Sequence, residues 1–93
     1  MDAKGYIEKY NMLVAKTLKA NEAYKRADAK REEAEKNYQR YVTSKATVET
    51  IKKYTKAYTR ASSFRATKLA QFEQARSELY KYMVYLKNKG IMW

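Results

Sequence analysis

Residues 42–47 carry the stretch Val-Thr-Ser-Lys-Ala-Thr, which stands between two long segments of helical pattern. β-branched and hydroxyl side chains lower helix propensity, and Ser and Thr favour helix ends instead. Thr47 or Ser44 can serve as the N-cap of a following helix, and Glu49 then lies in its first turn, where the helix dipole favours a carboxylate. The stretch therefore predicts a turn at about residues 43–46.

On the N-terminal side of this turn, apolar, small and tyrosine side chains recur at alternating spacings of four and three residues. A repeat of about 3.5 residues is typical of a helix that packs along a second helix. The positions are Tyr6, Tyr10, Leu13, Thr17, Ala20, Tyr24, Ala27, Arg31, Ala34, Tyr38 and Tyr41. We therefore expect a first helix over about residues 3–42.

On the C-terminal side, a line of mostly apolar side chains recurs at every seventh residue, and it comprises Ile51, Tyr58, Arg65, Phe72, Leu79 and Leu86. This repeat predicts a second helix from about residue 47 to about residue 89. Lys87 and Lys89 precede Gly90, and cations followed by glycine commonly end a helix. Residues 90–93 are then expected to form a short C-terminal tail.

The two segments predict an all-α fold, and the length allows one small domain over residues 1–93. We expect a long, coiled-coil-like antiparallel two-helix hairpin in which residue numbers of facing partners sum to about 88–90. The alternative is a three-helix bundle in which the second helix breaks near residues 59–63, where Ser62 and Ser63 can cap a third helix.

Large apolar side chains gather near both ends of the chain, which a hairpin brings together at its open end, here called the free end. Several of them, including Met12, Val14 and Val84, lie off the stripes that face the other helix, and exposed apolar patches usually mark association. Tyr and Trp are also enriched at protein interfaces. We therefore expect self-association into a helical bundle, such as a four-helix dimer. The candidate interface comprises Leu18, Tyr80, Tyr82, Met83, Tyr85 and Trp93.

The composition excludes several classes of site. The chain has no Cys, no His, no Pro and two Gly, so it cannot build a Cys/His zinc site, a thiol or imidazole nucleophile, or a glycine-rich phosphate loop. Asp28, Glu32 and Glu35 share one helical face, but nearby cations make a solvated acidic surface the expected interpretation rather than a Mg²⁺ or Ca²⁺ site. We expect no metal, no cofactor and no enzymatic activity.

The charge distribution is the strongest functional signal. The net charge is +11, and no Asp or Glu occurs between Thr50 and Phe72. Four cations on this segment fall within about 100° of a helical wheel, on the side away from Ile51 and Tyr58. With Lys45, they form the candidate polyanion-binding set Lys45, Lys52, Lys53, Lys56 and Arg60. Clustered cations bind polyanions through phosphate contacts and counterion release, so nucleic acid or a nucleoprotein is the expected partner.

Two alternative functions remain open. The basic face can dock on an acidic groove of a larger protein or nucleoprotein, as a small accessory inhibitor of the kind that phages and mobile elements make. Alternatively, hairpins rich in tyrosine can polymerise as structural subunits, for instance in a viral coat or a filament.

Two arginines lie on the predicted helix–helix seam, and burial of an unpaired guanidinium would cost several kcal/mol. Arg65 is expected to meet Asp28, which lies about one turn from its facing residue Tyr24. Arg31 faces Tyr58 and has no acid opposite it. It is therefore expected to extend to solvent, to stack on a tyrosine, or to meet a carboxylate of another chain.

Residues 10–15 form the longest uncharged apolar stretch, six residues long, which is far below the ~20 residues of a membrane-spanning helix. The N-terminal residues also lack the long apolar core of a secretory signal. We expect a cytoplasmic protein, or one packaged in a particle that is assembled in the cytoplasm, with no membrane association.

Overall fold

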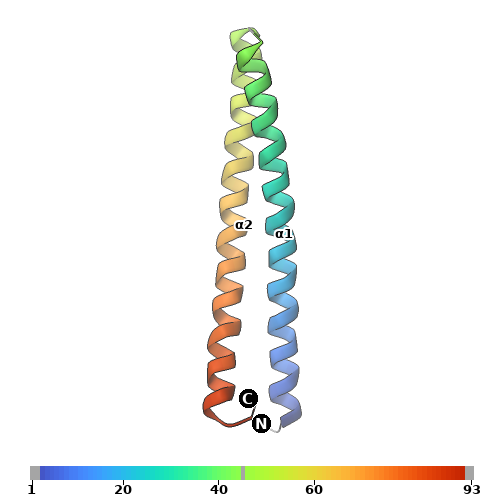
Figure 1. Ribbon diagram of the computed structural model, residues 1–93, viewed down its shortest axis with the longest axis vertical. Helices are drawn as coiled ribbons and strands as arrows, with labels where there is room; N and C mark the ends of the chain where they lie inside the picture. The colour runs from blue at the N-terminus through green and yellow to red at the C-terminus, as the bar shows by residue number, and fades with distance from the viewer. Residues whose placement is uncertain (1–2, 45, 92–93) are drawn as a thin grey trace.

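The computed structural model describes residues 3–44 and 46–91. These residues form two antiparallel α-helices, α1 (Ala3–Thr43) and α2 (Val48–Asn88), which lie side by side along their whole length (Figure 1). The molecule measures 65 × 17 × 16 Å. The predicted all-α helical hairpin is thus confirmed, and each predicted helix boundary from residue 42 onward differs from the structure by one residue.

The alternative three-helix bundle is wrong, because α2 continues without interruption through residues 59–63. Ala61 and Ser62 are half-buried on the side that faces α1, and Arg65 follows one turn later on the same side. No Gly or Pro occurs in this segment to break the helix. The heptad pattern therefore outweighs the weak capping tendency of the two serines.

The turn is formed as the hydroxyl side chains predict. Thr47 is the N-cap of α2, and its Oγ1 accepts a hydrogen bond from the Thr50 backbone N–H at 3.2 Å. At the end of α1, the Thr43 hydroxyl donates to the Gln39 carbonyl at 2.8 Å, and the Ser44 N–H donates to the Arg40 carbonyl at 3.1 Å. These bonds satisfy backbone groups that a helix end otherwise leaves without partners.

The C-terminal end of α2 is closed by a glycine cap. Gly90 has a φ of 71°, and this left-handed conformation is readily adopted by glycine. The Gly90 N–H donates to the Lys87 carbonyl at 3.0 Å, and the Ile91 N–H donates to the Leu86 carbonyl at 3.1 Å. This is the Schellman arrangement, and the apolar contact that accompanies it places Ile91 against the core beside Leu86.

The core is thin and lies mainly at the free end. Leu13, Tyr82 and Leu86 form its buried cluster, with exposed fractions of 9%, 8% and 0%. The Tyr82 hydroxyl donates to the Tyr6 carbonyl at 3.2 Å, and burial raises the pKa of Tyr82. Farther along the hairpin, the small residues Ala27 and Ala75 are the only buried ones among the residues that the structure describes. Most of the buried apolar surface therefore lies where the two chain ends meet.

Stacked aromatic pairs connect the helices elsewhere. The rings of Tyr41 and Tyr54 are 4.2 Å apart and tilted by 6°, and those of Tyr38 and Tyr58 are 5.8 Å apart and tilted by 22°. The residue numbers of partners in hydrogen bonds and ring contacts between the helices sum to between 88, for Tyr6 with Tyr82, and 96, for Tyr38 with Tyr58. This range is wider than the predicted one, because long side chains reach into the neighbouring turn of the other helix.

Candidate nucleic-acid interface

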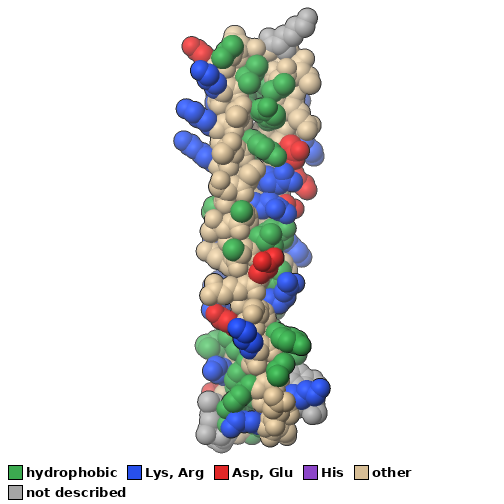
Figure 2. Space-filling model, turned by 90° about the vertical axis from the view of Figure 1, so that its left-hand side faces the viewer, with side chains coloured by type: hydrophobic (Ala, Val, Ile, Leu, Met, Phe, Trp, Pro, Cys, Tyr) green, Lys and Arg blue, Asp and Glu red, His purple; other side chains and the backbone are tan. Residues whose placement is uncertain are grey.

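A row of cations lies on the outer face of α2 near the turn. Its members, here called the basic stripe, are Lys52, Lys53, Lys56 and Arg60, and all four are exposed. Figure 2 shows Lys and Arg side chains standing out in a row near this end of the molecule. Tyr54 and Tyr58 stack on tyrosines of α1, which places the stripe on the opposite side of α2. The predicted outward orientation is therefore confirmed; Lys45 lies outside the described residues.

The basic stripe has no acidic partner within the described part of the chain. The described residues form four ion pairs, and none of them includes a stripe residue. They are Lys16–Glu78, Arg26–Glu22, Arg31–Glu35 and Arg65–Asp28. The Lys53 ammonium does lie 5.7 Å from the ring centre of Tyr54. Lys52 and Arg60 are eight residues apart, about 12 Å along the helix at ~1.5 Å per residue. This length corresponds to the rise of about three or four phosphates on one DNA strand.

The tyrosines next to the stripe do not offer a surface for stacking bases. Tyr54 and Tyr58 are each half-buried in their cross-helix stacks, as the helical wheel predicts. A hydrogen bond with Tyr41 also raises the pKa of Tyr54. The stripe can therefore contact phosphates, while its neighbouring aromatic rings are engaged in holding the hairpin together.

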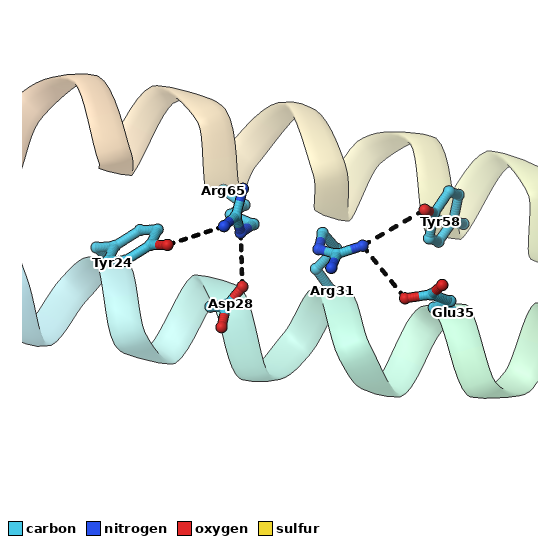
Figure 3. A network of polar contacts seen from close by, with 6 residues as sticks. All are labelled: Tyr24, Asp28, Arg31, Glu35, Tyr58 and Arg65. Atoms are coloured by element: carbon cyan, nitrogen blue, oxygen red, sulfur yellow. Dashed lines mark hydrogen bonds and ion pairs between the residues drawn. The ribbon is translucent and has the colours of Figure 1, made fainter.

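The seam beside the stripe is held by Arg65. Its Nε donates to Asp28 Oδ1 at 2.5 Å, and its guanidinium also donates to the Tyr24 hydroxyl at 2.8 Å (Figure 3). The bond to Asp28 raises the pKa of Arg65. Both partners were expected from the sequence and are confirmed. The contact fixes α1 and α2 relative to each other about one turn beyond the stripe.

Arg31 finds its carboxylate on its own helix. One of its terminal nitrogens lies 3.2 Å from Glu35 Oε2 and 3.4 Å from the Tyr58 hydroxyl, whereas its Nε is buried and donates to no described atom (Figure 3). Extension into solvent, stacking on a tyrosine and pairing with a carboxylate of another chain were the expected alternatives, and Arg31 instead pairs with Glu35 on its own helix. The i,i+4 spacing of Arg31 and Glu35 is the signal that sequence reasoning overlooked.

Changing Asp28 to Asn should lower the melting temperature of the protein by a few degrees. The side chains of Asp28 and Arg65 are only 33% and 30% exposed, so the guanidinium would lose its charged partner in a poorly solvated place. Thermal unfolding followed by circular dichroism measures the effect. Glu22→Gln is the matched control, because Glu22 and Arg26 are 69% and 79% exposed and 4.0 Å apart. Equal effects of the two changes would contradict a structural role for the Asp28–Arg65 pair.

Comparison with protein-family models, curated proteins and solved structures finds no significant match. The chain's own residues must therefore carry the functional argument. No helix in the described residues has a stretch that is both long and apolar enough to cross a membrane.

The residues predicted to form a protein interface are not all on the surface. Leu18, Tyr80 and Tyr85 are exposed to 59%, 66% and 42%, and Met83 is half-buried. Tyr82 must be removed from this set, because it fills the core against Leu13 and Leu86. Tyr82 lies seven residues after Ala75, which is also buried, so the heptad spacing is the signal for this burial. Trp93 lies outside the described residues.

Tyr85 belongs to a small cluster that sequence reasoning did not identify. The Lys89 ammonium lies 5.1 Å from its ring centre, and a hydrogen bond with Lys89 lowers the pKa of Tyr85. The ring of Tyr6 lies 6.3 Å away on α1. The i,i+4 spacing of Tyr85 and Lys89 is again the signal for this contact.

The described residues also include several acidic side chains and a shallow groove between the helices. Among the described residues, no group of three or more acidic side chains is placed to hold a metal ion, and Asp28 and Glu35 are already paired with arginines. A shallow groove of about 360 Å³ lies between the helices on one side of the hairpin. It is lined by Lys16, Lys19, Ala20, Ala23, Gln71, Gln74 and Ala75. These side chains do not include a paired acid and base or an activated nucleophile.

Proposed function

We propose that the protein is a non-catalytic binding module that attaches to the backbone of duplex nucleic acid through the basic stripe. The observation that carries this proposal is the position of four exposed cations on one helix face without an acidic partner in the described residues. Lysine and arginine that neutralise phosphates release condensed counterions, and this release supplies most of the affinity of sequence-independent binding. Bases are not read, because the nearby tyrosines are stacked within the hairpin.

The rigidity of the site supports the same function. The stripe occupies nine residues of one uninterrupted helix, so its cations keep their spacing when the protein is free. The tyrosine stacks and the Arg65–Asp28 contact hold this helix against α1 from behind. Little backbone ordering is therefore required on binding, which lowers the entropic cost of association.

The dependence of affinity on salt tests this proposal. With four phosphate contacts, the logarithm of the association constant for duplex DNA should fall with the logarithm of salt concentration with a slope of about −3.6. Affinity should then fall about 150-fold between about 50 and 200 mM salt. Fluorescence anisotropy with duplexes of two unrelated sequences measures both the slope and the expected lack of sequence preference. No binding at the lower salt concentration, or a slope near zero, would overturn the proposal.

An acidic protein is the competing partner for the same stripe. Affinity purification from lysate with and without nuclease separates the two partners. Under the proposal, material captured by the protein is released by nuclease treatment. A protein that stays bound after nuclease treatment, together with failure to bind purified duplex, would replace nucleic acid by an acidic protein surface.

A further inference from the structure

Apolar side chains at the free end form a surface on the side of the hairpin away from the groove. On α1, Ile7, Val14 and Leu18 fall within an arc of about 40° and recur at i, i+7 and i+11. On α2, Tyr80 and Met83 lie within about 60° of each other. On each helix, the centre of this group lies roughly 160° around the helix from the centre of the side chains that line the groove, so the two groups share the opposite side of the molecule. We call these five residues the free-end surface.

This surface is substantially exposed in the single hairpin. Ile7 is 48% exposed, Leu18 is 59% exposed and Tyr80 is 66% exposed. The five residues lie within the first 18 and the last 14 positions of the chain, and no exposed large hydrophobic residue occurs on α1 between Leu18 and Val42. On α1, the exposed large hydrophobic residues therefore lie in the free-end third of the hairpin, apart from Val42 beside the turn.

The area that the hairpin exposes indicates what covers this surface. A compact monomer of 11.0 kDa is expected to expose about 5,600 Å², whereas this chain exposes 7164 Å². The excess of about 1,500 Å² exceeds the ~800 Å² that each partner buries in a standard protein interface. A second copy of the chain is a suitable occupant, because a two-fold axis matches an apolar patch with itself.

Charge decides how two copies are oriented. Residues 43–71 contain seven cations and one acid, a net charge of +6. In a parallel pair, the basic segments 43–71 of the two copies would run side by side. Their like charges would repel each other, because salt does not screen charges that lie within the Debye length of about 10 Å at 0.1 M salt. In an antiparallel pair that overlaps only at the free ends, the two turns point in opposite directions. The free-end surface occupies about one third of the hairpin, so it also matches this partial overlap better than full-length contact.

We propose that two copies of the protein pair through the free-end surface in antiparallel orientation, forming a four-helix bundle at the centre with a turn at each end. The pairing does not depend on nucleic acid, so it can be tested independently of the proposed binding function. It covers Leu18, Tyr80 and Met83 of the interface predicted from the sequence.

Mass and substitution test the pairing. In the absence of nucleic acid, light scattering after size exclusion should give twice the chain mass of 11.0 kDa at high micromolar concentration. Leu18→Glu with Tyr80→Glu should give a monomer at the same concentration. Val48→Glu with Phe64→Glu is the matched control, because these side chains are 67% and 48% exposed but lie outside the free-end surface. This control should remain a dimer. A monomeric mass for the unchanged protein, or equal loss of the dimer in both double variants, would overturn the proposal.

Cross-linking tests the orientation of the two copies in the dimer. It needs only single substitutions at exposed positions, which are not expected to disrupt folding. The chain has no Cys, so a single introduced thiol reports one position cleanly. Asn11 is exposed and lies between Ile7 and Leu18, near the centre of the overlap, whereas Ser44 is exposed at the turn. Asn11→Cys should form a disulfide-linked dimer on mild oxidation and Ser44→Cys should not. Rapid cross-linking through Ser44→Cys would show a parallel pair and overturn the antiparallel arrangement.

Discussion

Reversal of all four charges of the basic stripe to glutamate should lower the affinity for duplex DNA by at least about 10³-fold at 0.15 M salt. Each phosphate contact contributes about 0.7 decades of affinity at this salt concentration, and four contacts together contribute about three decades. Glutamate adds repulsion between the new carboxylates and the phosphates, so the loss exceeds that of neutral replacement. Fluorescence anisotropy with a labelled duplex measures the change, and circular dichroism checks that helicity is retained.

A control of equal charge separates the stripe from the overall basicity of the protein. Each reversal removes two charges, so the four-fold variant has a net charge of +3 instead of +11. Reversal of four exposed lysines on α1, namely Lys4, Lys19, Lys25 and Lys30, gives the same net charge. The control should retain most of the affinity, because it leaves the stripe intact. An equal loss in both variants would mean that net charge, and not the stripe, governs binding.

Leu86→Ala should reduce the free energy of unfolding by about 2–5 kcal/mol, the range for truncation of a buried leucine. Leu86 is the one large side chain that is fully buried among the described residues, and it packs with Leu13 and Tyr82. Small domains are stable by only about 5–15 kcal/mol, so a large share of the total would be lost. Urea unfolding followed by the helical circular-dichroism signal measures the change at a fixed protein concentration.

Phe64→Ala provides the comparison for the Leu86 prediction. Phe64 is also a large apolar residue on α2, but it is 48% exposed and lies outside the buried cluster. Its truncation should cost about 1 kcal/mol or less, because about half of the residue already contacts water. Equal destabilisation by the two changes would contradict the conclusion that the Leu13–Tyr82–Leu86 cluster is the main source of stability.

Most of the fold follows from local features of the sequence. The heptad positions, the Thr47 cap and the cation–glycine ending at Gly90 each specify one part of the hairpin, and all three are present in the structure. These signals are reliable because they act within one or two helical turns. The range of cross-helix partners was predicted less well, since it depends on how far each long side chain reaches along the seam.

The site was predictable to the extent that it depends on the direction in which a side chain leaves its helix. The outward cations and the inward Tyr54 and Tyr58 follow from helical periodicity. The assignment of Tyr82 failed, because residue type favoured an interface while position placed the ring in the core. The prediction for Arg31 considered carboxylates of the facing helix and of another chain, whereas its partner Glu35 lies one turn away on the same helix.

The hairpin places the start of α1 and the end of α2 at one end of the molecule, opposite the turn (Figure 1). A bulky fusion protein attached to either terminus would therefore crowd the same end, while the outer face of α2 near the turn would stay clear. If the proposed pairing is correct, such a fusion should keep the protein monomeric while it leaves the basic stripe accessible. A tag for studies of the proposed dimer is therefore better placed in the turn.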